Sequence, residues 1–567
     1  MTPRKILDFL EDRTGLGASF RKLFDEPVIG GPRWAYVFGS ALATLFLVQC
    51  VTGLLLMFTY APTVDGAWSS VFYLQHRVTA GWFIRGLHAY GANAMVVILG
   101  IHMFQVVLFG AYKRPREVTF WIGMGLMALL LGLIISGYRL PWDQRTFWAL
   151  QVEMNIARAM PGGESIYRLV AGGPELGQLT LTRLYTAHVA LLPALFVGLI
   201  LLKVSLVRRH GRTPPPGADL SVKVNAFPWQ FVRDQAFVIL VLLAVALLTV
   251  ATGGEGLAAP ADPNRFFPAR PEWFLLPLYK LRMLVPPAAE ILVTGVLPVL
   301  LGGFLFLLPL LDRKESAGWG ARLAWAAPVV VLGIGTVALA AKSMDDDHKD
   351  KEHVQHLADA EHRADRAIEL AKMGIPPEGP LVMLERDPLT RGRDVYRQLC
   401  TGCHVLHGEG ERKSPDHDGF ASRSWILGLL RDPQSEHYFG ELEHDEEMPS
   451  QKKLGEESLV AVTEFLFAQG REPQDPPVDR ALVEAGEEVF EKKCLKCHMF
   501  EGEGDFLGTE GPNLTDWASR TWIMRQVRDP SDPRQYGGLH QMPSFRDQLS
   551  EHDMWMVAAY LRLQRFE

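Results

Sequence analysis

Seven apolar stretches, each long enough to cross a membrane, constrain this chain more than any other feature of its sequence. About 20 residues of α-helix cross the ~30 Å hydrocarbon core of a bilayer. The stretches cover residues 34–60, 81–110, 117–138, 181–207, 235–253, 289–311 and 321–341. Beyond residue 342 the chain is charged and poor in such stretches. The sequence therefore predicts a membrane part followed by a water-soluble part.

Basic residues orient the spans. They lie before the first stretch and in three of the connections: Arg4, Lys5, Arg21, Lys22, Arg33, Lys113, Arg114, Arg116, Arg208, Arg209, Arg212, Lys223, Arg313 and Lys314. Connections rich in Lys and Arg stay in the cytoplasm. An odd number of spans then puts the soluble part in the periplasm, beyond a bacterial inner membrane. We expect no cleaved signal peptide, because the first twenty residues lack a short apolar core with a cleavage site.

The charge balance argues against nucleic acid as a partner, since the net charge is −7 and no basic stripe is present. The connections 139–180 and 254–288 both fall on the outer side. They are too rich in apolar and aromatic residues to be plain solvated loops, so we expect them to form a shared site.

The soluble part contains an internal repeat. GRDVYRQLCTGCH returns as GEEVFEKKCLKCH, and SRSWILGLLRDP returns as SRTWIMRQVRDP, at a period of 94 to 97 residues. The predicted fold is all-α, a seven-helix membrane bundle followed by two small tandem helical domains. The predicted parts are a cytoplasmic segment 1–33, a four-helix core 34–210, a three-helix part 211–342, a charged linker 343–385, and the repeats 386–472 and 473–567.

Each repeat carries a Cys-x-x-Cys-His motif. The motif residues are Cys400, Cys403 and His404, and Cys494, Cys497 and His498. Two thiols at this spacing can form thioethers with haem vinyl groups while the adjacent His ligates iron; a zinc site would need a second ligand pair. A Met-Pro-Ser segment follows each His by 44 residues, so Met448 and Met542 are predicted as second iron ligands. Two covalent haem c groups are therefore expected.

Paired histidines mark the membrane part. His88 and His102 are 14 residues apart in the stretch 81–110, which places them about 21 Å apart along a helix and within ~40° of one face. The same interval separates glycines on two other predicted helices, at Gly39 and Gly53 and at Gly123 and Gly137. A missing Cβ lets a flat porphyrin approach the backbone, although close helix packing is the alternative. The shared interval favours two stacked haem layers.

Several segments resemble one known family. GYRLPWDQ begins at Gly137, LTRLYTAH ends at His188, and Pro271-Glu272-Trp273-Phe274 is similar to a PEWY motif. Over roughly residues 30–340 the chain resembles cytochrome b of the quinol-oxidising cytochrome bc and b6f complexes. The soluble part resembles a tandem dihaem cytochrome c.

The resemblance implies roles for individual residues. His88 and His188 would bind a haem b near the outer face, and His102 and Lys203 a second haem b near the inner face. Glu272 would accept a proton from quinol with Tyr138 nearby, whereas Phe274 removes the hydroxyl of the motif's Tyr. Further residues predicted to contact cofactor or quinone are Arg85, Asp234 and Arg208. For Asp234 and Arg208 the alternative is that they are ordinary interface charges flanking a helix.

Lys203 stands where the resemblance places a second His, fifteen residues after His188. Burial favours the neutral amine, whose lone pair can coordinate iron. Alternatively, Lys203 snorkels to the headgroups, and the inner haem is five-coordinate, differently ligated or absent.

The predicted activity is that of a quinol–cytochrome c reductase-type oxidoreductase subunit. It would divide electrons from the quinone pool between a Rieske iron–sulfur protein and the two b haems, and pass electrons through the c haems to a cytochrome c-type acceptor or terminal oxidase. A homodimeric complex that contributes to proton translocation is expected. The alternatives are a quinone-linked membrane anchor without electron bifurcation and a haem-tailed transporter or sensor.

Overall fold

The computed structural model describes residues 9, 11–13, 27–313, 319–440, 448–504, 511–536 and 542–566. Two compact units are present, residues 1–381 and 382–567. Most of the predicted cytoplasmic segment 1–33 lies outside the described residues, as do Arg4, Lys5, Arg21, Lys22 and Lys314.

Seven helices in the described part of the first unit are long and apolar enough to cross a membrane, which confirms the predicted number. They are α3 (Val37–Met57), α5 (Gly81–Phe109), α6 (Glu117–Tyr138), α9 (Gln178–Thr186) continued by α10 (Leu192–His210), α11 (Trp229–Thr252), α13 (Leu297–Leu311) and α14 (Trp319–Lys349). The short turns η1 (Trp34–Tyr36), η2 (Ala187–Leu191), η3 (Pro287–Ala289) and η4 (Leu292–Val296) extend or join them.

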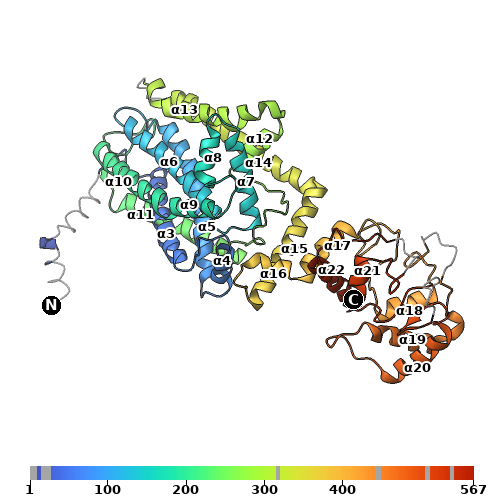
Figure 1. The fold of residues 1–567 in the computed structure, drawn as a ribbon. Coiled ribbons are helices and arrows are strands. Elements are labelled where there is room, and N and C mark those ends of the chain that lie inside the picture. The colour runs from blue at the N-terminus through green and yellow to red at the C-terminus, as the bar shows by residue number, and fades with distance from the viewer. Residues whose placement is uncertain are drawn as a thin grey trace. The chain divides into compact units, whose positions relative to one another are not determined.

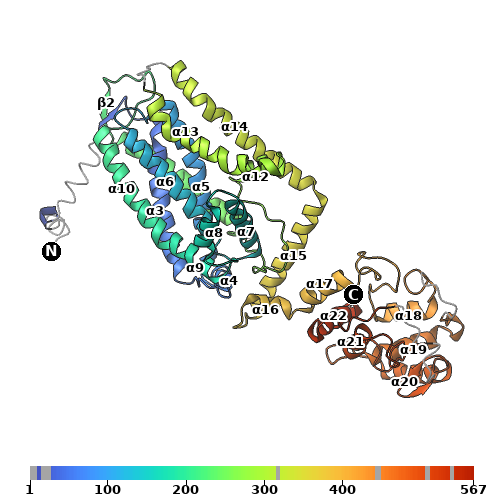
Figure 2. The ribbon, with the colours of Figure 1, turned by 45° about the horizontal axis from the view of Figure 1, so that its top comes forward.

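Five of these helices surround one apolar core. Helices α3, α5 and α11 pack on one another, and α6 packs on α10 (Figures 1 and 2). The core includes Leu45 from α3, Met95 from α5, Ile134 from α6, Phe196 from α10 and Val238 from α11. Each helix therefore turns one apolar stripe inward and leaves other apolar residues facing outward, as expected for helices in lipid.

The two ends of the bundle differ. At one end lie the short helices α4 (Ala67–His76), α7 (Gln144–Arg158) and α8 (Gly163–Ala171), whereas β1 (Pro27–Ile29) pairs antiparallel with β2 (Lys223–Asn225) at the other end (Figure 2). Asp143 starts α7 through a capping box with Thr146. The backbone N–H of Gln144 donates to the carbonyl of Ala259 at 2.8 Å. The two long outer connections therefore meet, and the prediction that they form a shared site stays a prediction.

Charged residues extend the last span beyond its predicted end at residue 341. Helix α14 continues to Lys349. Asp350 then caps the N-terminus of the next helix, α15 (Lys351–Met373). Asp347 pairs with Arg270 at 2.7 Å, and Asp346 pairs with Lys280 of α12 (Leu276–Met283). These ion pairs hold the acidic turn against the bundle. Ala367 and Ala371 are buried, so α15 packs on the first unit along part of the predicted linker.

The second unit contains both repeats. Helix α16 (Pro380–Glu385) precedes the first repeat, which has η5 (Pro388–Gly392), α17 (Arg393–Leu399), α18 (Arg423–Arg431), η6 (Lys452–Leu454) and α19 (Glu456–Gln469). The second has α20 (Arg480–Lys493), the ladder β3 (Met499–Phe500) with β4 (Glu503–Gly504), α21 (Arg520–Arg528), α22 (Glu551–Leu563) and η8 (Gln564–Phe566). Ser422 and Ser519 cap α18 and α21 in the same way.

Helices of one repeat pack on helices of the other repeat. The aromatic ring of Tyr396 in α17 lies 5.9 Å from that of Tyr560 in α22, and a Cβ on Gly392 would lie 2.7 Å from the Tyr560 Cβ. The rings of Phe490 in α20 and Phe465 in α19 are 5.1 Å apart. The first helix of each repeat therefore packs on the last helix of the other repeat.

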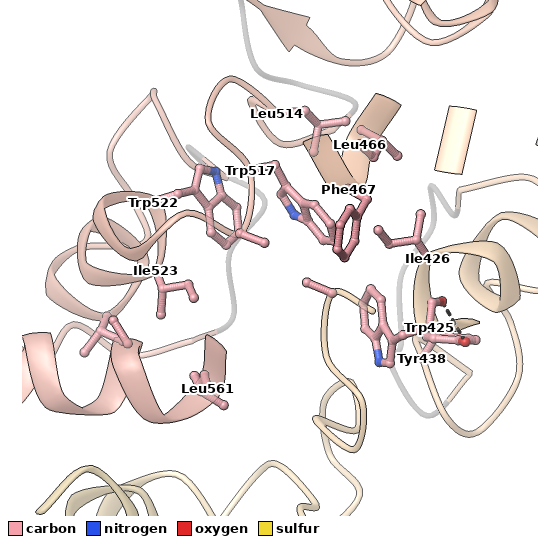
Figure 3. Close-up of a cluster of buried hydrophobic side chains, with 14 of the residues drawn as sticks. Trp425, Ile426, Tyr438, Leu466, Phe467, Leu514, Trp517, Trp522, Ile523 and Leu561 are labelled. Atoms are coloured by element: carbon pink, nitrogen blue, oxygen red, sulfur yellow. Dashed lines mark hydrogen bonds between the residues drawn. The ribbon is translucent and has the colours of Figure 1, made fainter. Parts of the chain in front are cut away.

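This packing between the repeats gives one aromatic core that both repeats share. Figure 3 shows Trp425 and Phe467 of the first repeat gathered with Trp517 and Trp522 of the second. The rings of Trp425 and Trp517 are 6.2 Å apart at an interplanar angle of 30°. The predicted boundary at 472/473 separates two sequence repeats that share one hydrophobic core.

We predict that residues 382–472 made alone do not unfold cooperatively, whereas residues 382–567 do. The shorter chain loses the partners of α17 and α19, and each large buried aromatic contributes about 3–5 kcal/mol to stability, against a usual total of about 5–15 kcal/mol. Thermal unfolding followed by circular dichroism measures the difference. A sharp transition of the 382–472 fragment near that of the longer chain would contradict the packing between the repeats.

Candidate cofactor and proton-transfer sites

Two histidines face each other inside the bundle. His88 belongs to α5, and His188 belongs to η2, a π-helical turn that joins α9 to α10. Their ring centroids are 6.1 Å apart, with ring planes at 75°. Since a metal–imidazole bond is about 2 Å long, one iron fits between the two rings. A π-turn is frequent at functional sites, and here it carries His188 toward α5.

Hydrogen bonds orient both imidazoles. His88 Nδ1 lies 2.9 Å from Thr52 Oγ1, and His188 Nδ1 lies 2.9 Å from the Leu133 carbonyl oxygen. Such contacts fix a ligating ring and leave its Nε2 for a metal. The chemistry of this donor set fits a haem b with two imidazole ligands.

Glycines leave room beside these rings. A Cβ on Gly137 would lie 2.5 Å from His188 Cε1, and one on Gly53 would lie 3.2 Å from His88 Cε1. Around Gly39 a Cβ would meet no atom within 4 Å in the described structure. A side chain at Gly53 or Gly137 would therefore crowd a candidate ligand, which is the space requirement expected for a porphyrin cradle.

The second pair lies further along the same two helices. His102 is on α5, with its Nδ1 3.2 Å from Gln105 Oε1, and Lys203 is on α10. A Cβ on Gly123 would lie 2.6 Å from Lys203 Nζ, and Lys203 lies within electrostatic range of His102. The amine therefore points at the helix α6 backbone inside the bundle.

The segment Pro271–Phe274 approaches the His88 end of the bundle. The Trp273 indole donates to Asn93 Oδ1 at 2.6 Å, and Tyr138 lies close to the same Asn93 side chain. Burial raises the pKa of Glu272 above its ordinary value, and the neighbouring Arg139 opposes part of that rise. A buried carboxyl whose pKa is raised in this way can take up a proton nearer to neutral pH.

Arg139 and Glu153 also belong to this site, although neither residue was predicted from the sequence. Arg139 directly follows α6 and donates to Glu153 Oε1 of α7 at 2.5 Å and to Glu272 Oε1 at 3.4 Å. One feature of the sequence could have indicated Arg139: it is a cation directly after a long apolar helix, within the segment GYRLPWDQ. Its partners are far away in the chain, so spacing alone did not identify them.

At the opposite end, Asp234 of α11 accepts hydrogen bonds from Ser40 Oγ at 2.9 Å and Gln230 Nε2 at 2.8 Å. Its cationic neighbour is Arg212, at 3.7 Å. Arg208, which the sequence analysis named beside Asp234, is exposed. The chain turns at Gly211, just after α10 ends, and this turn brings Arg212 to the carboxylate.

Arg85 holds the connection that follows α11. Its guanidinium is buried and donates to the carbonyls of Glu255 at 2.5 Å and Gly256 at 2.9 Å. Arg85 thereby fixes the outer connection near His88.

The two Cys-x-x-Cys-His segments have the same local geometry. His404 Nδ1 lies 2.8 Å from the Pro415 carbonyl oxygen, and His498 Nδ1 lies 3.0 Å from that of Pro512. Burial lowers the pKa of both histidines, which favours the neutral imidazole that binds iron.

The remaining motif residues surround these histidines. Cys400 and Cys494 directly follow α17 and α20. Met448 and Met542 pack against the shared core. Both segments have the residues that a covalent haem c requires.

Known proteins match both parts of the chain. Residues 93–263 match the family described as cytochrome b(N-terminal)/b6/petB, and residues 481–561 match the family described as cytochrome c oxidase, cbb3-type, subunit III. A cytochrome bc complex cytochrome b subunit of Chlorobaculum thiosulfatiphilum is 33% identical over 288 residues, covering 50% of this chain and 67% of that protein. A cytochrome b6 of Gracilaria tenuistipitata var. liui is 37% identical over 212 residues, covering 37% of this chain and 99% of that protein.

A solved structure has a similar fold. It is described as a hyperthermophilic respiratory Complex III, and it aligns with 60% of this chain and 91% of its own at a TM-score of 0.52 and 25% identity.

We predict that Gly137→Val removes one b-type haem, because the new side chain takes the space beside His188. The covalent c haems provide an internal standard, so the b-to-c ratio in a pyridine haemochrome assay should fall to about half. Gly198→Val is the matched control, since a Cβ there would meet no described atom within 4 Å. An unchanged ratio in Gly137→Val would contradict the cradle.

Proposed function

The chain belongs to the cytochrome b/b6 family, and from this premise we propose that it oxidises a membrane quinol at the end of the bundle that holds His88, His188 and Glu272. As a cytochrome b of a bc-type complex it is an integral membrane oxidoreductase subunit of quinol-linked electron transport, with a cytochrome c part at its C-terminal end. Membership of this family argues against the alternative that the chain is a haem-tailed transporter or sensor. The observation that carries the proposal is a partly buried carboxyl at the same end as the facing imidazoles.

Four haem groups are proposed. His88 with His188 and His102 with Lys203 would each hold one haem b. Each Cys-x-x-Cys-His segment would hold one haem c, with Met448 or Met542 as the second ligand. When bound, these groups accept and donate single electrons.

The residues around Glu272 handle the protons. Oxidation of quinol to quinone releases two electrons and two protons, and the Glu272 carboxylate takes one of these protons. Trp273, whose indole donates to Asn93, and the neighbouring Tyr138 would line the quinol position. Phe274 packs against the bundle core without adding a polar group.

The two electrons leave by different routes. One passes to a Rieske iron–sulfur protein and then through the c haems to a cytochrome c-type acceptor or terminal oxidase. The other crosses through the b haems to a quinone held near Asp234, where Arg212 supplies the nearby cation in place of Arg208. Proton release at one face and uptake at the other would contribute to proton translocation.

The basic connections support the orientation of the spans. Lys113, Arg116 and Arg212 lie between spans on the side of the β1–β2 ladder, which we assign to the cytoplasm. The c-type unit would then be periplasmic in a bacterial inner membrane. A homodimeric complex is proposed on the family resemblance.

We predict that Glu272→Gln slows quinol oxidation about 100-fold and removes its rise with pH, while the haem spectra stay unchanged. The amide keeps the shape of the carboxyl and cannot accept the proton. Steady-state turnover of the purified complex measures the effect. Glu164→Gln, which breaks an exposed ion pair on α8, is the control. Normal turnover of Glu272→Gln at every pH would exclude the proposed role.

For Lys203 we predict that Lys203→Met and Lys203→His each alter the low-spin EPR signal of one b haem, because both replace the ligand atom. The exposed neighbour Leu202→Met is the control and should leave the signal unchanged. If neither Lys203 variant changes the signal, Lys203 is not an iron ligand.

A further inference from the structure

Arg139 is a buried cation at the edge of the proposed quinol site. Its side chain is 1% exposed and lies at the C-terminal end of α6. The negative end of a helix dipole favours a cation in this place. Burial of a guanidinium still costs several kcal/mol unless carboxylates compensate it. The partners of Arg139 therefore decide how its charge is used.

Two carboxyls share this one charge. Arg139 Nη2 is 2.5 Å from Glu153 Oε1, and Arg139 Nη1 is 3.4 Å from Glu272 Oε1. The shorter contact makes Glu153 the stronger partner. Two ionised carboxylates beside one guanidinium would leave an uncompensated negative charge in a poorly solvated place. A proton would therefore go to the more weakly held carboxyl, which is Glu272.

Other charged or titratable groups also act on Glu272. Arg145 of α7 favours its ionised form, and Glu255 of the connection after α11 disfavours it. Tyr138 also lies within electrostatic range. Burial and the negative charge of Glu153 raise the pKa of Glu272. Among the groups that lower this pKa, Arg139 has the largest effect. The sharing of Arg139 therefore sets the balance.

We propose that Arg139 and Glu153 are positioning residues of the quinol-oxidising site: Arg139 holds the Glu272 carboxyl in place, and Glu153 competes for Arg139 so that Glu272 can accept a proton. This inference rests on the proposed function of Glu272. When quinol gives its two electrons to the two proposed acceptors, both of its hydroxyl O–H bonds break: one proton forms a new O–H bond on Glu272, and the other is released at the same face. Arg139 then remains paired with Glu153, so the newly neutral Glu272 does not leave a buried unpaired cation.

The test is the pH dependence of quinol oxidation by the purified complex. Quinol oxidation needs the ionised carboxylate, so its rate rises with pH through the pKa of Glu272. In Glu153→Gln, Arg139 turns fully to Glu272, lowers that pKa and shifts the rising limb by about one pH unit to lower pH. In Arg139→Met the opposing charge is lost, and the limb shifts to higher pH.

A double variant covers the case in which Arg139→Met does not fold. Arg139→Met combined with Glu153→Gln removes one cation and one anion together, so the net charge of the cluster is unchanged, and its limb should lie at higher pH than that of Glu153→Gln alone. Glu164→Gln removes a carboxylate from an exposed ion pair at the same end and should leave the limb unmoved. Unchanged haem spectra show that each variant retains its cofactors.

The outcomes separate this inference from the proposed function. If Glu272→Gln abolishes the limb but Glu153→Gln and the double variant leave it in the wild-type position, the positioning role is overturned and the role of Glu272 stands. If Glu272→Gln retains the wild-type limb, the proposed function of Glu272 fails first. A loss of rate that is equal at every pH in Glu153→Gln would indicate only a structural salt bridge.

Discussion

His88 of α5 and His188 of η2 meet inside the membrane bundle, and the space between their rings constrains how the surrounding helices pack. Rings 6.1 Å apart are suited to one shared metal, while Gly53 and Gly137 keep the neighbouring backbones close without filling that space. Hydrogen bonds to the Nδ1 atoms then fix the rings. The π-turn that carries His188 and the small residues on α3 and α6 follow from the same requirement.

A second requirement, the handling of buried charge, shapes the end of the bundle near Glu272. An apolar setting makes the carboxyl a better proton acceptor, and one guanidinium shared with Glu153 limits how far its charge is stabilised. At the other end, Asp234 lies among Ser40, Gln230 and Arg212. Under the proposed function, the two ends would therefore offer different chemistry to the same kind of molecule.

Local patterns predicted the seven spans, the 14-residue spacing on α5 and the internal repeat, because length, periodicity and repetition are visible in a single sequence. Contacts between distant segments were not predictable in this way. Arg139 meets Glu153 only after α7 folds back from its capped start, and Arg212 reaches Asp234 because the chain turns at Gly211. The packing of helices between the repeats depends on which apolar faces fit, and both repeats present similar faces.

The central claim is that electrons from one quinol divide between the b haems and the c haems. It is tested most directly by adding quinol and then an oxidant of the c haems to the purified complex, with the quinone site near Asp234 blocked, while b-haem absorbance is followed. The account predicts that the b haems become more reduced as the c haems are oxidised. Oxidation of the b haems together with the c haems would contradict it and would favour a membrane anchor with a single electron path.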